Sequence, residues 1–424
     1  MALAADARVT PPATRAAGGR FEQVDALRAL AALLVLWFHA LIRAGAVDSP
    51  FAAVMARLDV GVAIFFAISG FLLYRPFAVA RLADTPGPRT VAYAWRRVLR
   101  IAPGYWVALA VSAVLLRMGD LLEPGPLLTH ALLLQAFDPA RLFGGLPQGW
   151  TLTVEVCFYA FLPLFALVMR RLPGGARAEW AALGVVAVAS VAWKAAFLLT
   201  AADPSHANAA IELLWLPAFL DWFAAGMALA VATVVAPAAL ARIPTGVAWG
   251  AALGAFLLMC YGLGPSGISL FGASTTAAQA LGRHVLSAVV AVGLLLPAVS
   301  ARARRGAISR VLGNPRVLWL GVVSYGIYLW HVLALELIDR SDVVERTGAD
   351  PYAVYLLGGT ALSVLAGWIS WRLVERRALA LKRLVPDRTA PPRDVVNASD
   401  RQSAAASSTS PASATQWAPS SDGA

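Results

Sequence analysis

The sequence has few charged residues for its length. Of its 424 residues, 14% are Asp, Glu, Lys or Arg, whereas soluble globular proteins have about 25%. So little charge cannot cover a folded surface with polar groups, which argues against a soluble enzyme. The two cysteines, Cys157 and Cys260, lie in apolar segments. They therefore support neither a disulfide framework nor a metal site.

Lysine is also nearly absent, because Lys194 and Lys382 are the two lysines among 35 basic residues. The net charge of +11 is therefore almost entirely arginine. These arginines lie mostly between apolar runs and do not form one basic patch. This distribution argues against a nucleic-acid-binding domain and is typical of a membrane protein.

Long apolar runs make up most of the chain. The hydrophobic fraction is 59% and the mean hydropathy is +0.68, so we expect an all-α polytopic membrane protein. At about 20 residues a span, the runs predict ten transmembrane helices. These are 24–42, 60–78, 102–117, 152–169, 180–199, 213–235, 245–263, 282–300, 317–338 and 354–374.

Arginine in the connecting loops predicts the orientation. With a cytoplasmic N-terminus, the inner loops hold 14 arginines and the outer loops hold 6, in agreement with the positive-inside rule. Ten spans return the C-terminus to the cytoplasm, so both termini are expected on that side. We expect the protein in the inner or plasma membrane.

The ends of the chain lack apolar periodicity. Residues 1–20 and 386–424 are predicted to be disordered tails, and residues 21–385 form the predicted transmembrane domain. The stretch 126–137 is apolar but short. It is compatible with either a re-entrant or an interfacial helix.

The first span carries three ionisable residues, Asp25, Arg28 and His39. Arg28 and His39 are eleven residues apart, which is three turns plus about 20°, so both lie on one helix face about 16 Å apart along the axis. Asp25 falls within roughly 40° of this stripe. Asp25 and Arg28 could simply form an i,i+3 ion pair, and His39 could be a packing histidine. Because ionisable groups inside a membrane are costly, we favour a functional role.

Polar residues in other spans are further candidates by the same rule. They are Ser69 beside Gly70, Trp150, Glu155, Tyr159, Asp221, His284, Ser324, Tyr325 and His331. Small-residue packing is the simpler interpretation of Gly70, and structural roles stay open for Asp221, His284 and His331.

Three arginines, Arg96, Arg97 and Arg100, stand together before the predicted third span. They could be a topology signal alone, but clustered guanidinium groups also suit a polyphosphate. His39 and Glu155 are expected in the outer half of the membrane. A basic inner mouth and an outer His/carboxylate site, suited to removing a hydroxyl proton, predict group transfer across the bilayer.

The same residues resemble the acyltransferase 3 family of integral membrane O-acyltransferases. The resemblance covers about residues 24–385. Its five motifs occur in the family's order, with Thr151 in place of a serine. They are Arg28 with His39, Phe65–Leu72, Arg96–Pro103, Trp150–Tyr159 and Ser324–His331. The chain is similar to stand-alone members without a fused hydrolase-like domain.

The resemblance implies transfer of an acyl group, preferably acetyl, from cytosolic acyl-CoA to a hydroxyl of a carbohydrate or glycosylated product. Acyl-CoA would be a co-substrate, and we expect no bound cofactor, metal or nucleic acid. His39 and Glu155 are the expected catalytic residues. The donor would contact Arg28, Arg96, Arg97, Arg100 and Ser69. Acceptor or supporting roles fall to Asp25, Trp150, Tyr159, Asp221, Ser324, Tyr325 and His331.

A secondary transporter is the alternative, because transporters also use intramembrane Arg, His and Glu. Many transporters contain internal repeats. The motifs containing His39 and Ser69 each occur once in this sequence. This observation favours the acyltransferase.

Overall fold

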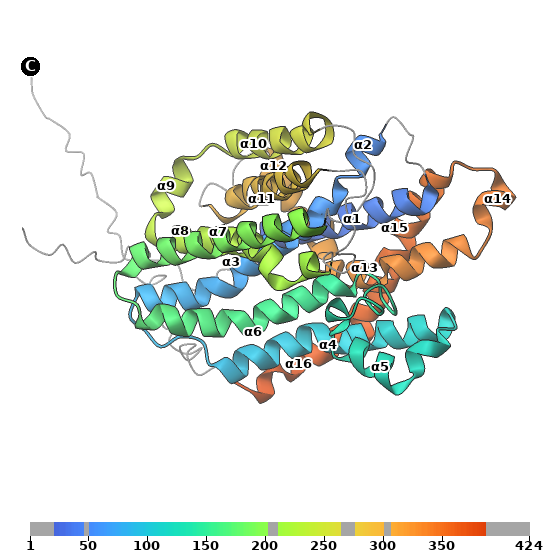
Figure 1. Ribbon diagram of the computed structural model, residues 1–424, viewed down its shortest axis with the longest axis horizontal. Helices are drawn as coiled ribbons and strands as arrows, with labels where there is room; N and C mark the ends of the chain where they lie inside the picture. Colours follow the sequence, from blue (N-terminus) through green and yellow to red (C-terminus); the bar gives the residue numbers. More distant parts are fainter. Residues whose placement is uncertain (1–20, 46–50, 202–210, 264–275, 301–306, 387–424) are drawn as a thin grey trace, which may run out of the picture.

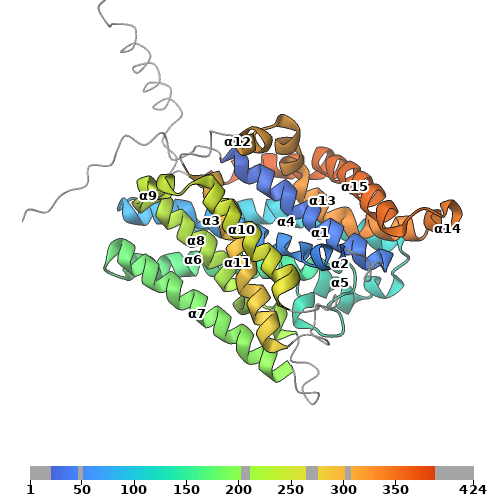
Figure 2. The same cartoon turned by 90° about the horizontal axis from the view of Figure 1, so that it is seen from above.

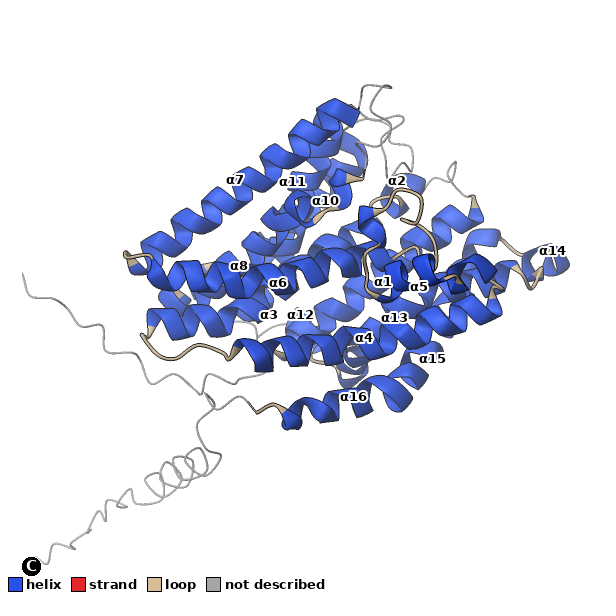
Figure 3. Ribbon diagram, turned by 60° about the horizontal axis from the view of Figure 1, so that its bottom comes forward, coloured by secondary structure: helices blue, strands red, loops and turns tan. Residues whose placement is uncertain are grey.

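The computed structural model describes residues 21–45, 51–201, 211–263, 276–300 and 307–386. The expected tails, residues 1–20 and all but the first residue of 386–424, lie outside this part. All regular elements in the described part are helical (Figure 3). Ten helices in these residues are long and apolar enough to span a membrane. The all-α multi-pass prediction is therefore confirmed.

The long helices run side by side along the horizontal of Figure 1. The spans contain α1 (Glu22–Ala44), α3 (Gly61–Leu82), α4 (Thr90–Leu115), α6 (Gly149–Arg171), α7 (Gly175–Ala201), α8 (Leu220–Val235), α10 (Thr245–Leu257), α11 (Ala277–Val299), α13 (Pro315–Asp339) and α15 (Pro351–Ser370). Short helices lie at the ends of the bundle, including α2 (Ala52–Met55), α5 (Pro124–Ala131), α9 (Pro237–Arg242) and α14 (Val343–Thr347).

Helix α1 lies near the middle of the bundle, and Figure 2 shows it between α3 and α15. It packs against α3, α13 and α15, and α3 in turn packs on α8. In the spans that contain α3, α8 and α13, 67% of the 18-residue apolar stretch is buried inside the protein, against 11% in the span that contains α7. Peripheral helices such as α7 therefore offer apolar side chains to lipid, while α1 carries Asp25, Arg28 and His39 among the inner helices.

Close backbone contacts join the inner helices. A Cβ atom at Gly70 of α3 would overlap the carbonyl group of Phe223 in α8, and one at Gly226 would overlap the carbonyl group of Ala67. Small residues let membrane helices approach this closely. Gly70 therefore has the packing role that the sequence favoured.

Helix α4 begins twelve residues before the predicted third span. Arg96, Arg97 and Arg100 thus lie inside the helix and not at its start, which corrects the expectation. Neighbouring residues such as Ala92 and Leu99 are buried and give this segment an apolar face. The segment 126–137 forms α5 and a 3-10 turn (Gln135–Phe137), and neither is long enough to span a membrane.

A buried ion pair joins three helices at the expected inner end of the bundle. Arg81 of α3 lies 2.9 Å from Glu179 of α7, and the hydroxyl of Tyr74 donates to the same carboxylate. Arg81 also donates to the carbonyls of Met169 and Leu172 at the end of α6. It therefore supplies partners for carbonyls that a helix end leaves without intrahelical bonds.

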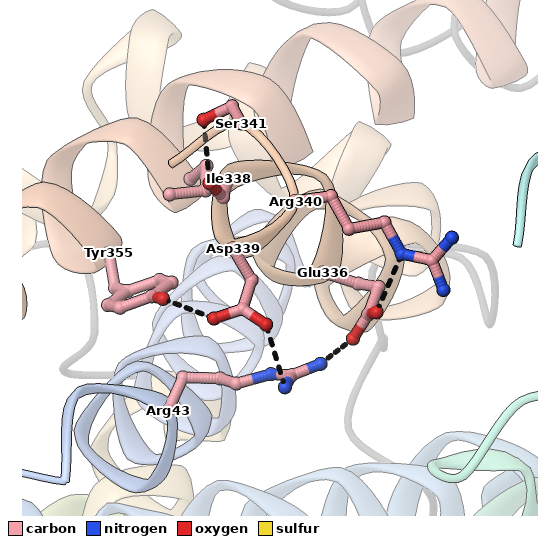
Figure 4. Close-up of polar contacts among 7 residues, drawn as sticks. All are labelled: Arg43, Glu336, Ile338, Asp339, Arg340, Ser341 and Tyr355. Atoms are coloured by element: carbon pink, nitrogen blue, oxygen red, sulfur yellow. Dashed lines mark hydrogen bonds and ion pairs between the residues drawn. The ribbon is translucent and has the colours of Figure 1, made fainter. Parts of the chain in front are cut away.

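At the opposite end, Figure 4 shows a polar network that ties α1 to α13 and α15. Arg43 forms ion pairs with Glu336 and Asp339, and the Tyr355 hydroxyl donates to Asp339 at 2.6 Å. Arg340 also pairs with Glu336. Arg43 is one turn beyond His39, so this network fixes the helix end that carries the histidine.

Candidate active site

A cavity of about 460 Å³ opens at the expected outer end of the bundle. It lies where α1 and α7 end and where α3, α6, α8 and α11 begin. His39, Gln148 and Thr151 are among its polar lining residues, and Trp150, Phe219 and Trp222 among its aromatic ones. The volume is within the usual range of small-molecule sites.

His39 enters the cavity from α1, and its tautomer follows from its partner. Its Nδ1 atom lies 2.8 Å from the backbone oxygen of Val35. A carbonyl oxygen can only accept a hydrogen bond, so Nδ1 carries the proton. The Nε2 atom of the neutral ring then has a free lone pair. Such a nitrogen is able to take a proton from a hydroxyl group.

His331 of α13 supports this ring from the protein side. Its Nδ1 atom donates to the Tyr328 carbonyl at 2.6 Å, which leaves its Nε2 atom as an acceptor 3.3 Å from Nδ1 of His39. The two ring centres are 4.8 Å apart, and His331 is completely buried. His331 therefore helps to hold the proton of His39 on Nδ1.

Helix α6 forms the floor beside the histidines. The hydroxyls of Thr151 and Tyr328 are 2.5 Å apart, and both residues line the cavity. The amide nitrogen of Gln148 donates to the Leu329 carbonyl at 2.7 Å. Its Oε1 atom is buried and has no hydrogen-bond partner, so it offers an acceptor to a bound hydroxyl group.

Glu155 lies one turn further along α6, below this floor. Its Oε1 atom accepts hydrogen bonds from Ser69 at 3.0 Å and from Tyr159 at 2.7 Å. It also interacts electrostatically with Arg28. Glu155 is not among the residues that line the cavity. The structure thus links Glu155 to the arginines and separates it from the cavity that His39 lines.

The arginine cluster comprises Arg28, Arg97 and Arg100. Arg28 interacts electrostatically with Arg100. The Arg97 guanidinium lies 5.7 Å from the ring centre of Tyr159, and that of Arg100 lies 5.4 Å from the ring centre of Tyr325. The aromatic faces stabilise these cations where water is scarce. The Nε atoms of Arg28 and Arg97 are buried without partners, so both can donate to an added anion.

Comparison with known proteins shows the family to which the chain belongs. A family model for an acyltransferase domain matches residues 21–372. The chain belongs to the acyltransferase 3 family. It is therefore an acyltransferase enzyme, and the transporter alternative is set aside.

Two curated relatives share most of their length with this acyltransferase. It is 29% identical over 332 residues to the exopolysaccharide production protein ExoZ of Rhizobium meliloti (strain 1021), covering 76% of this chain and 90% of the relative. It is 27% identical over 410 residues to nodulation protein 10 of Rhizobium leguminosarum bv. viciae, covering 88% and 96%. No solved structure is significantly similar to the chain.

The remaining predicted site residues of the acyltransferase do not all lie at the cavity or at the arginine cluster. Trp150 lines the cavity, whereas Ser324 donates within its own helix to the Gly321 carbonyl. Asp25 interacts with Arg28. Arg96 is half-buried on α4. Asp221 lies behind the cavity wall, where it is 2.9 Å from His284.

Sequence reasoning missed several charged residues close to these sites, among them Arg57, Asp59 and Arg283 in the cavity lining. Lys194 lines the cavity, and its position inside a predicted span was a sufficient signal for it. Glu375 is buried and interacts electrostatically with Arg28 and Arg100. It ends a π-helical turn, Trp371–Glu375, and such turns are frequent at functional sites. The hydropathy pattern contains no signal for that turn.

Proposed function

We propose that the acyltransferase moves an acetyl group from cytosolic acetyl-CoA to a hydroxyl of a carbohydrate or glycosylated product on the opposite side of the inner membrane. The observation that carries this proposal is the geometry of His39, whose Nδ1 proton is held by Val35 and whose Nε2 lone pair is free. The printed name of ExoZ, an exopolysaccharide production protein, supports a carbohydrate acceptor.

The arginine cluster is the proposed donor site. Arg28, Arg97 and Arg100 would bind the phosphates of the CoA, because guanidinium groups form strong, forked bonds to phosphate oxygens. Arg28 and His39 share a helix face and are about 16 Å apart along it. This length is comparable with that of the extended carrier arm of CoA, so the thioester could reach the histidine.

The transfer step needs one base. Nε2 of His39 takes the proton from the acceptor hydroxyl as its oxygen attacks the carbonyl carbon of the thioester. A carbon–oxygen bond forms and the carbon–sulfur bond breaks. The proton then passes from His39 to the departing CoA thiolate, so the products are the ester and CoA thiol.

Other side chains position these groups. The Nε2 atom of His331, 3.3 Å away, accepts a hydrogen bond from the Nδ1–H group of His39 and so favours the imidazolium that forms in the reaction. Glu155 interacts with Arg28 and fixes Ser69 and Tyr159 by hydrogen bonds. We propose that it orients the donor site.

A direct assay tests this function. The purified protein in lipid vesicles is expected to transfer label from acetyl-CoA to at least one member of a panel of simple glycosides, and the product is an ester that mild base cleaves. Propionyl-CoA and palmitoyl-CoA test the chain length. If no glycoside is labelled while a protein or lipid hydroxyl is, the carbohydrate assignment is wrong.

A further inference from the structure

One end of the cavity is strongly charged, and the proposed transfer step does not use it. Arg57 precedes α3, Lys194 lies in α7 and Arg283 lies in α11, and all three line the cavity. These residues come from three separate segments of the chain. The fold therefore gathers three cations beside a pocket that is otherwise largely apolar.

Arg57 has unused hydrogen-bonding capacity although it is buried. Its side chain is 7% exposed, and its Nη1 atom donates to the Ala56 carbonyl at 3.2 Å. Its Nε and Nη2 atoms are buried without partners, and so are the same two atoms of Arg283. Burying a charged donor without a partner costs free energy. Four guanidinium nitrogens beside this cavity thus lack a hydrogen-bond partner that a ligand could supply.

Neighbouring carboxylates balance only part of the charge of Arg57, Lys194 and Arg283. Asp59 interacts electrostatically with Arg57, Arg283 and Lys194, but no ion pair among the described residues joins it to either arginine. Asp221 is bonded to His284 and Ser190. Three cations thus stand against two carboxylates.

Lys194 and Asp59 add a positive charge and hydrogen-bond acceptors to the two arginines. The Lys194 ammonium lies 4.1 Å from the ring centre of Phe219, so it is held over an aromatic face. Asp59 is exposed to the cavity and offers oxygens that accept from sugar hydroxyls. The two arginines offer donors with a geometry that matches a carboxylate or a phosphate.

We propose that Arg57 and Arg283 bind an oxyanion on the acceptor, so the enzyme prefers acceptors that carry a carboxylate or a phosphate near the acylated hydroxyl. This inference rests on the proposed function, because the same cavity holds the acceptor hydroxyl at His39. The inference narrows the proposed acceptors to those that carry a negative charge. His39 and the two arginines line one cavity of about 460 Å³, so one small glycoside can reach both.

Matched acceptors test the charge requirement. Methyl β-D-glucuronide and its uncharged amide have nearly the same shape, and methyl β-D-glucoside 6-phosphate provides the phosphate form. We expect kcat/KM for the better anion to exceed that for the amide by about 10–100-fold, the usual range for charge-assisted hydrogen bonds. Whichever anion is better identifies the source of the oxyanion.

Variants then assign the preference to the arginines. Arg283→Gln is expected to remove most of the preference by raising KM for the anion while leaving kcat/KM for the amide nearly unchanged. Arg57→Lys, which keeps the charge and loses the fork, is expected to remove part of it. Arg346→Gln is the matched control, because Arg346 of α14 is exposed at the same end of the bundle and its side chain donates only to the nearby Asp342 carbonyl among the contacts of the described residues.

The possible failures are distinct. Equal kcat/KM for anion and amide in the wild type, or an unchanged preference in Arg283→Gln, overturns the oxyanion site and leaves the proposed function standing. Transfer to no glycoside at all contradicts the proposed function itself. Binding of CoA by Arg283→Gln, measured in parallel, shows that this variant is folded.

Discussion

Replacing His39 with glutamine is expected to reduce acyl transfer by about 10²–10⁴-fold, the usual contribution of a general base. Glutamine has similar bulk, and its amide can still donate to the Val35 carbonyl that now accepts from Nδ1. It cannot take a proton at neutral pH, whereas a neutral imidazole, with a reference pKa near 6.5, can. Single-turnover rates with bound acetyl-CoA measure this effect separately from donor binding.

The His39→Gln experiment needs two control measurements. His130→Gln is the matched control, because His130 lies in α5 and does not line the cavity, so its transfer rate should stay near wild type. Unchanged CoA binding by His39→Gln would show that the fold is intact. Near wild-type transfer by His39→Gln would mean that His39 only packs. The base role would then pass to His284, which also lines the cavity.

Replacing Arg100 with alanine is expected to weaken CoA binding and raise KM for acetyl-CoA by about 10–100-fold. Arg100 lies beside Tyr325 and interacts electrostatically with Arg28, and a lost charge-assisted contact to phosphate has this magnitude. Arg100→Lys should restore part of the affinity, because lysine keeps the charge but lacks the planar fork. Isothermal titration of the purified variants with CoA measures the effect.

The control for this cluster is Arg89→Ala. Arg89 is exposed just before α4, so it tests the general effect of removing one positive charge next to the same helix. CoA should bind to Arg89→Ala as it does to wild type. If Arg100→Ala and Arg89→Ala bind CoA equally well, Arg100 contributes to topology alone and the donor site lies elsewhere.

The sequence predicts the membrane-spanning helices well because apolar length is a local property. Each of the ten predicted spans overlaps an observed helix. The predicted start of α4 was wrong because arginine usually marks the end of a span. Here Arg97 and Arg100 lie inside the helix and contact the rings of Tyr159 in α6 and Tyr325 in α13. Contacts between helices thus explain why α4 extends past these arginines, which hydropathy alone does not predict.

The candidate site was predictable along one helix but not between helices. The spacing of Arg28 and His39 places both on one face of α1 from helix geometry alone. The partners of Glu155 depend on how α6 packs against α3, so its separation from the cavity could not be predicted. The support of His39 by His331 likewise joins α1 to α13, 292 residues apart in sequence.

In the proposed function, the donor binds on one side of the membrane and the acceptor is modified on the other. Vesicles with the cytoplasmic face outward test this sidedness most directly. One glycoside is sealed inside the vesicles, and a second glycoside and labelled acetyl-CoA are added outside. The account predicts label on the enclosed glycoside and none on the external one. Label on the external glycoside, with the enclosed one unmodified, would contradict it.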